Sequence, residues 1–350
     1  MRNILTAAVA ASLFSILSHP VLAADDPKPL FASDDIISFT LSGPLNGISR
    51  KPDAAPVPGT LKLNGAAPET LPVMLSTRGI TRRMTQICSF PPLRVTFTDK
   101  PGKDSLFRGQ KELKLVTHCQ SSDRYQQDVF LELSAYRLYR ALTPQSFNAR
   151  LAKVDYVTGD GHAITTKYGF FLEDISDLAR RNGQSRFKSA KKISQTQLDP
   201  EAAARFAVFE YMISNLDWAM TANAGDRECC HNSRLIGAKD ASTGLITVPY
   251  DFDYSGLVDA PYAVPPEQLK ITSVTQRLYR GYCVSTEQMP AVIADYRAHR
   301  AEMMAVIESD PRLNATFKGK TARFLDGFFA LLDDPAKVDA LIVKRCRVGA

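Results

Sequence analysis

The stretch from residue 211 to residue 256 decides how this chain is interpreted. It begins Tyr-Met-Ile-Ser-Asn-Leu-Asp-Trp at position 211 and ends Pro-Tyr-Asp-Phe-Asp-Tyr-Ser-Gly at position 256. Two strand-like segments, 233–236 and 245–248, lie between these motifs and predict a hairpin with Asn232 at its start and Asp251 at its exit. Both side chains are then expected at one edge of a sheet. Such a layout suits phosphoryl transfer, because carboxylate and amide oxygens bind Mg²⁺ and one carboxylate can deprotonate an acceptor.

The two end motifs resemble those of a known protein family. Asn215-Leu216-Asp217 and the later Tyr250-Asp251-Phe252-Asp253 resemble the paired motifs of the CotH family of secreted atypical protein kinases. The resemblance covers roughly residues 75 to 260, and the order of the two motifs carries more information than either alone. Families of this kind often have a basic residue or His directly after the loop Asp, whereas this chain has Trp218 and Ala219.

The resemblance implies a role for each acidic or amide residue of the stretch. Asp217 is implied as the catalytic base. Asn232 and Asp251 are implied as ligands of Mg²⁺, and Asp253 as a second acid near the metal. The implied cofactors are ATP and Mg²⁺, and the implied partner is a protein or small molecule that accepts the phosphoryl group.

The same resemblance implies that residues earlier in the chain bind the nucleotide. Lys114, in the strand-like segment 112–117, matches the lysine that contacts the phosphates, and Glu132 matches the helix glutamate that pairs with it. Phe171, Leu172 and Glu173 are implied to touch the adenine ring. From the residues alone, a solvated strand lysine, an exposed helix glutamate and aromatic core residues explain these positions equally well.

The implied fold class is α+β, with two kinase-like lobes. A β-rich N-terminal extension is expected over residues 24–70, a β-rich N-terminal lobe over 71–172, and a mainly helical C-terminal lobe over 173–350. Apolar spacing predicts a helix over about 128–142, and Asp199-Pro200-Glu201 predicts the start of another through an N-cap and a proline at the first helical position. Further helices are expected near 287–307, 320–332 and 335–344.

The first 23 residues predict an export signal. Arg2 precedes an apolar run, and Val21-Leu22-Ala23 ends it with a small-x-small pattern before a polar start. The run is short for a membrane span, and no other stretch approaches that length, so the mature chain is expected to lack a transmembrane segment. A periplasmic or secreted location follows.

Export changes the interpretation of the six cysteines. An even number of cysteines in an oxidising compartment favours disulfides. Cys88 and Cys119 lie in neighbouring strand-like segments, while Cys283 can reach Cys346 or one of the adjacent pair at 229 and 230. A zinc site at this pair and His231, with His118 or Cys119 as a further ligand, is the alternative, but it lacks a spaced Cys-x-x-Cys motif. At least two disulfides and no zinc are therefore expected.

Three functions remain open at this point. The first is an exported kinase that moves the γ-phosphoryl group of ATP to an acceptor. The second is a binding or scaffold protein of the cell envelope that lacks the chemistry. The third is a metal-dependent hydrolase that uses Asp217, Asp251 and Asp253, although a His-rich ligand set is missing. A net charge of +6 with 43 basic and 37 acidic side chains gives no indication of a nucleic-acid partner.

Overall fold

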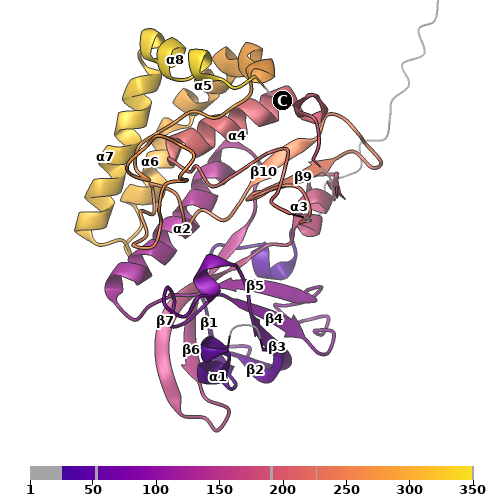
Figure 1. The fold of residues 1–350 in the computed structure, drawn as a ribbon. Helices are drawn as coiled ribbons and strands as arrows, with labels where there is room; N and C mark the ends of the chain where they lie inside the picture. The colour runs from indigo at the N-terminus through magenta and orange to yellow at the C-terminus, as the bar shows by residue number, and fades with distance from the viewer. Residues whose placement is uncertain (1–25, 52–53, 190–191, 226, 349–350) are drawn as a thin grey trace, which may run out of the picture.

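The computed structural model describes residues 26–51, 54–189, 192–225 and 227–348. The predicted export signal at residues 1–23 lies outside them. Within the described residues, no helix is long and apolar enough to cross a membrane. The molecule divides into a β-barrel and a larger, mainly helical part, with α2 running from the barrel up along the helices (Figure 1).

Seven strands close into the barrel in the order β1-β2-β3-β4-β5-β7-β6. Neighbouring strands pair antiparallel except β1 and β6, which pair in parallel and close the barrel. Alternate side chains of each strand point inward, so that Phe39, Leu41, Val95 and Leu115 are fully buried in the barrel interior. The strands are β1 (Ile37–Ser42), β2 (Val57–Leu63), β3 (Glu69–Thr77), β4 (Leu93–Phe97), β5 (Glu112–Val116), β6 (Ala149–Val157) and β7 (Ala163–Leu172), and a short helix α1 (Leu45–Arg50) follows β1.

The helical part is built around α2 (Asp123–Leu142) and α4 (Pro200–Met212). Both helices are buried over most of their length, and they share one apolar core with the C-terminal helices. Asp199 caps α4 as predicted, since its side chain accepts a hydrogen bond from the Ala202 N–H at 2.8 Å. The other helices are α3 (Ile175–Arg181), α5 (Met289–Ala298), α6 (Arg300–Glu308), α7 (Ala315–Leu332) and α8 (Pro335–Leu341).

A second sheet of three strands lies against α4, and it carries the second half of the motif stretch. Its order is β10-β9-β8, formed by β8 (Ser185–Phe187), β9 (Ser233–Gly237) and β10 (Ile246–Pro249). The predicted hairpin is confirmed: Val248 pairs with Arg234, and Ile246 with Ile236. Asn232 and Asp251 therefore lie just outside the ends of two adjacent strands.

The expected α+β fold class with two kinase-like lobes is wrong. The structure has a closed seven-stranded barrel in place of a β-sheet lobe, together with eight α-helices among the described residues. Closure depends on the pairing of β1 with β6, for example Phe39 with Val154. Period-two alternation identifies strands, but it carries no information about which distant strand completes a sheet.

The prediction of at least two disulfides is confirmed. Cys88 is bonded to Cys119, Cys283 to Cys346, and the adjacent cysteines 229 and 230 to each other. The first bond joins the segment before β4 to the segment after β5, and the second ties the end of the chain to the segment before α5.

Candidate functional site

A cavity of about 640 Å³ brings the acidic and amide residues of the motif stretch together. Asp217, Asn232, Asp251 and Asp253 all line it. They come from the loop after α4, the start of β9 and the segment after β10. Five arginines from β4, β9, the segment between β3 and β4, and the loop before β9 line the same cavity: Arg78, Arg82, Arg94, Arg227 and Arg234. The site therefore combines carboxylates with a high density of guanidinium groups.

The loop that carries Asp217 is held by local hydrogen bonds. Asn215 accepts two of them, one at its side-chain oxygen from the Asp217 N–H at 3.1 Å and one at its backbone carbonyl from Trp218 Nε1 at 2.9 Å. The indole of Trp218 is buried and packs edge-on against Phe206. The aromatic residue after the loop Asp thus anchors the loop to α4.

Asp217 is in turn held by two side chains from the start of β9. His231 Nε2 lies 2.7 Å from Asp217 Oδ1, and the Asn232 side-chain amide donates to Asp217 Oδ2 at 3.0 Å and to the Asp217 carbonyl at 2.7 Å. Both His231 and Asp217 remain about one-third exposed to the cavity that they line. This carboxylate and imidazole can accept and pass on a proton.

Asn232 and Asp251, which both line the cavity, share an uncommon backbone conformation. Both residues have a positive φ, 45° and 67°, in the left-handed region that Asn and Asp adopt more readily than most other residues. The Asp251 N–H donates to the hydroxyl of Tyr136 on α2 at 3.0 Å. The helix and the second sheet therefore fix this position jointly.

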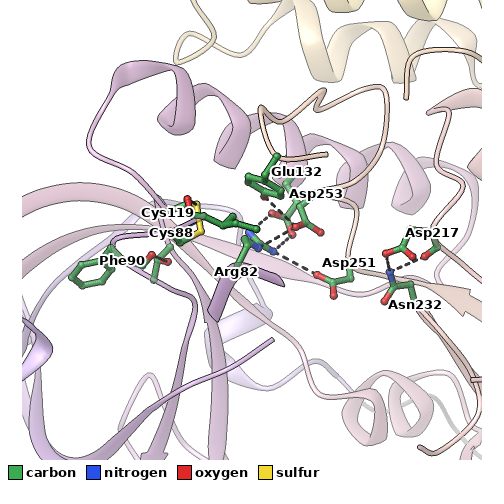
Figure 2. A network of polar contacts seen from close by, with 12 residues as sticks. Arg82, Cys88, Phe90, Cys119, Glu132, Asp217, Asn232, Asp251 and Asp253 are labelled. Atoms are coloured by element: carbon green, nitrogen blue, oxygen red, sulfur yellow. Dashed lines mark hydrogen bonds and ion pairs between the residues drawn. A yellow bond between two sulfur atoms is a disulfide. The ribbon is translucent and has the colours of Figure 1, made fainter. Parts of the chain in front are cut away.

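Arg82 lies at the centre of three carboxylates (Figure 2). Its guanidinium is 3.1 Å from Glu132, 3.1 Å from Asp253 and 3.5 Å from Asp251. Arg82 and Glu132 are almost completely buried, and Asp251 is one-third exposed on the cavity side. Tyr262 adds a hydrogen bond to Asp253 at 3.1 Å.

The three carboxylates outnumber the cation, and the pKa values of Glu132 and Asp253 are both raised. Burial raises the pKa of Glu132 to about 7, with Arg82 opposing the rise and the neighbouring aspartates adding to it. Burial likewise raises the pKa of Asp253 to about 6, again against the effect of Arg82. The pKa of Arg82 lies well above its usual range because the carboxylates outweigh its own burial. The cluster is therefore expected to hold a proton near neutral pH.

Lys114 lies near the cavity but is not among the residues that line it. Its ammonium group is 5.5 Å from the centre of the Tyr250 ring, whose face also meets the guanidinium of Arg234 at 4.4 Å. Burial, with Arg78 and Arg234 nearby, lowers the pKa of Lys114 to about 8. Glu132 forms its ion pair with Arg82, so the structure does not bring Lys114 and Glu132 together as the resemblance implied.

The residues implied to touch adenine lie elsewhere. Phe171 stacks on Phe39 inside the barrel, with ring centres 5.2 Å apart, and Leu172 is buried. Glu173 is buried against Arg181 at 2.9 Å, and burial raises its pKa. None of the three lines the cavity beside Asp217.

No protein-family model matches this chain, and no curated protein matches it either.

The predicted metal ligands do not fit a preformed magnesium site. Among the described residues, no group of three or more acidic, histidine or cysteine side chains is arranged to hold a metal ion. Asp251 and Asp253 face Arg82, and the amide nitrogen of Asn232 faces Asp217. Mg²⁺ requires about six oxygen ligands in near-octahedral geometry, and a guanidinium among its ligands would repel it.

The sequence analysis did not single out Arg82, and it named His231 only as a ligand of the alternative zinc site. Arg82 sits in the polar run Thr81-Arg82-Arg83, where arginines are ordinarily solvated. Nothing in that run indicates burial. His231 had a usable signal, because it directly precedes Asn232 at the start of a predicted strand and so must lie near the same sheet edge.

Proposed function

We propose that this protein is an exported enzyme that binds a phosphate-bearing ligand in the cavity and transfers a phosphoryl group to a hydroxyl acceptor. The observation that carries the proposal is the convergence of Asp217, Asn232, Asp251 and Asp253 on one arginine-lined cavity. Guanidinium groups are well suited to phosphate oxygens because their planar donors bind in pairs. ATP is the phosphoryl donor that the motif resemblance implies.

The acceptor side of the reaction is assigned to Asp217 and its histidine. Phosphoryl transfer requires a group that orients or deprotonates the attacking hydroxyl, while positive charge stabilises the transferred group. Asp217 is exposed to the cavity and hydrogen-bonded to His231 at 2.7 Å, so a proton taken from an acceptor has a defined path. The cations on the other walls of the cavity supply the charge.

Export is part of the proposal, and it rests on two features. The first is the signal-like sequence at residues 1–23. The second is that all six cysteines are paired in disulfides, a usage typical of oxidising compartments. The periplasm or the extracellular space satisfies both.

A second candidate is a binding protein of the cell envelope that performs no transfer. The observation that favours it is the contact of Arg82 with the carboxylates implied as metal ligands. Such a protein would bind the same phosphate-bearing ligands in the same cavity. The two candidates therefore differ in turnover and agree in binding.

One experiment separates the candidates. The purified mature protein is incubated with ATP labelled at the γ-phosphate and a mixture of hydroxyl-bearing acceptors, and label transfer is followed beside calorimetry of ATP binding. Transfer that is lost in Asp217→Asn supports the enzyme. Binding without transfer supports the binding protein, and absence of both rejects the nucleotide site.

A further inference from the structure

The environment of Arg82 is unusual for an arginine near a cavity. The segment between β3 and β4 supplies Arg82, helix α2 supplies Glu132, and the segment after β10 supplies Asp251 and Asp253. Glu132 receives two contacts from the guanidinium, at 3.1 and 3.4 Å, and Asp253 receives one from Nε at 3.1 Å. Three separate parts of the chain thus converge on one buried cation, as Figure 2 shows.

One guanidinium contacts four carboxylate oxygens of this cluster, two on Glu132 and one each on Asp251 and Asp253. The guanidinium uses donors on Nε, Nη1 and Nη2, and each points at a different carboxylate or carboxylate oxygen. A guanidinium stays charged at every physiological pH, so it cannot give way by losing a proton. A divalent ion that bound these same four oxygens would have to displace Arg82, of whose side chain only 7% is exposed.

Cations also gather around Tyr250, another residue that lines the cavity. Arg234 covers the face of Tyr250 and donates to its hydroxyl, and Lys114 approaches the same ring. Arg78 and Arg234 lie close enough to Lys114 to lower its pKa. The side chains of Arg78, Arg234 and Lys114 therefore provide positive charge near the partly exposed carboxylate of Asp251.

We infer that Arg82 is a built-in cation that takes the position of a divalent metal among Glu132, Asp251 and Asp253, so that the cavity holds a phosphate-bearing ligand through side-chain cations without a metal ion. The part of this inference that concerns the ligand rests on the proposed function. The part that concerns Arg82 does not, because it can be tested with a metal ion alone.

The first test is a titration of the ligand-free mature protein with Mn²⁺, followed by electron paramagnetic resonance and by the melting midpoint. The wild type is expected to show no saturable binding in the low millimolar range. Arg82→Met removes the guanidinium and leaves three carboxylates facing one another, so this variant is expected to gain Mn²⁺ binding and a rise in its midpoint. Arg108→Met, at an exposed arginine, is the matched control and is expected to behave like the wild type.

Submillimolar Mn²⁺ binding by the wild type that Asp251→Asn abolishes would overturn the role of Arg82. This outcome depends only on the wild type and on Asp251→Asn, a substitution at a partly exposed position, so it can be tested even if Arg82→Met does not fold. In that case Arg82→Lys serves as the second variant. It keeps the charge, and it is expected to remain without Mn²⁺ binding.

The second test measures ATP binding by calorimetry, once with EDTA and once with MgCl₂. The two dissociation constants are expected to agree within about threefold, a difference of less than about 1 kcal/mol. Binding that EDTA abolishes would overturn the metal-free cavity. If ATP binds in neither buffer, the proposed function fails and the claim about the ligand fails with it, while the Mn²⁺ titration still decides the claim about Arg82.

Discussion

His231 Nε2 lies 2.7 Å from Asp217 Oδ1, although the two residues stand fourteen positions apart on either side of a long loop. The contact closes that loop at its two ends, where α4 has just finished and β9 is about to begin. Asn232 holds the second oxygen of the same carboxylate at 3.0 Å. Asp217 is thereby fixed in orientation before any ligand arrives, which is the arrangement expected for a group that must receive a proton from a defined direction.

Replacement of Asp217 by Asn is expected to separate binding from turnover. The amide keeps the shape of the side chain but cannot take a proton, so label transfer from ATP should fall by about 10²- to 10⁴-fold. The dissociation constant for ATP should stay within about twofold, because the arginines that line the cavity are untouched. Asp240→Asn, at an exposed turn residue, is the control. Equal losses of affinity and turnover in Asp217→Asn would contradict the assigned role.

The acid cluster around Arg82 should make stability depend on pH in an unusual direction. The pKa of Glu132 is raised to about 7, so between its ordinary pKa and 7 the folded state binds more protons than the unfolded state. The stability contributed by this group is present at low pH and is lost as pH rises through 7. Glu132→Gln removes the effect, and its stability relative to the wild type should increase from about pH 5 to 7 by at most about 1.4 kcal/mol per pH unit.

Urea denaturation at several pH values measures this difference. Glu267→Gln, at an exposed glutamate, is the matched control and should follow the wild type at each pH. A difference between Glu132→Gln and the wild type that stays constant from pH 5 to 7 would show that Glu132 keeps an ordinary pKa in the fold.

Lys114 is expected to make stability rise with pH, the reverse of the effect of Glu132. Its pKa of about 8 lies below the ordinary value of 10.5, so between these values the unfolded state binds more protons and stability rises with pH. Lys114→Met should lack this rise, whereas Lys62→Met, at an exposed lysine of β2, should retain it. Lys114→Met should also weaken ATP binding below pH 8, where the wild-type side chain is charged. Wild-type denaturation curves that do not respond to pH between 8 and 10 would refute the assignment.

The disulfide between Cys283 and Cys346 is expected to contribute strongly to stability. It links residues 63 positions apart, and a loop of that size restricts the unfolded chain by about 4 kcal/mol in the chain-entropy description. The double variant Cys283→Ala/Cys346→Ala should therefore show a clearly lower melting midpoint. Dithiothreitol should lower the midpoint of the wild type further than that of the double variant. Identical midpoints for the double variant and the wild type would contradict the prediction.

Local structure could be predicted where the residues of a single segment, such as a helix cap or an alternating strand, are sufficient to indicate it. Asp199 and Pro200 mark the start of α4, and the alternation after Asn232 marks the hairpin of β9 and β10. The helix predicted over 128–142 is α2, which starts five residues earlier at Asp123. In each case the information lies within about a dozen residues, the range over which caps and periodicity act.

Features that depend on distant partners could not be predicted in the same way. Arg82 becomes a buried cation only because α2 and the segment after β10 bring carboxylates to it from 50 positions away or more. The resemblance implies that Glu132 pairs with Lys114, whereas in the structure Glu132 pairs with Arg82. The local sequence around Glu132 is the same in either case, so it does not indicate which cation is the partner. The resemblance implies that Phe171 contacts the adenine ring, whereas its ring lies inside the barrel, because a closed barrel has an interior that an open sheet lacks.

The pairing of β1 with β6 has a consequence for how the chain is made. Residues 43–148 separate these two strands, so a growing chain that has produced β1 to β5 still lacks the strand that covers the outer edge of β1. Contacts between positions so far apart form late and slow the search for the native state. During synthesis, the open edge would be available to other chains until β6 arrives. This protein should therefore depend on a holding chaperone more than a helical protein of equal length, and its yield should fall when that assistance is removed.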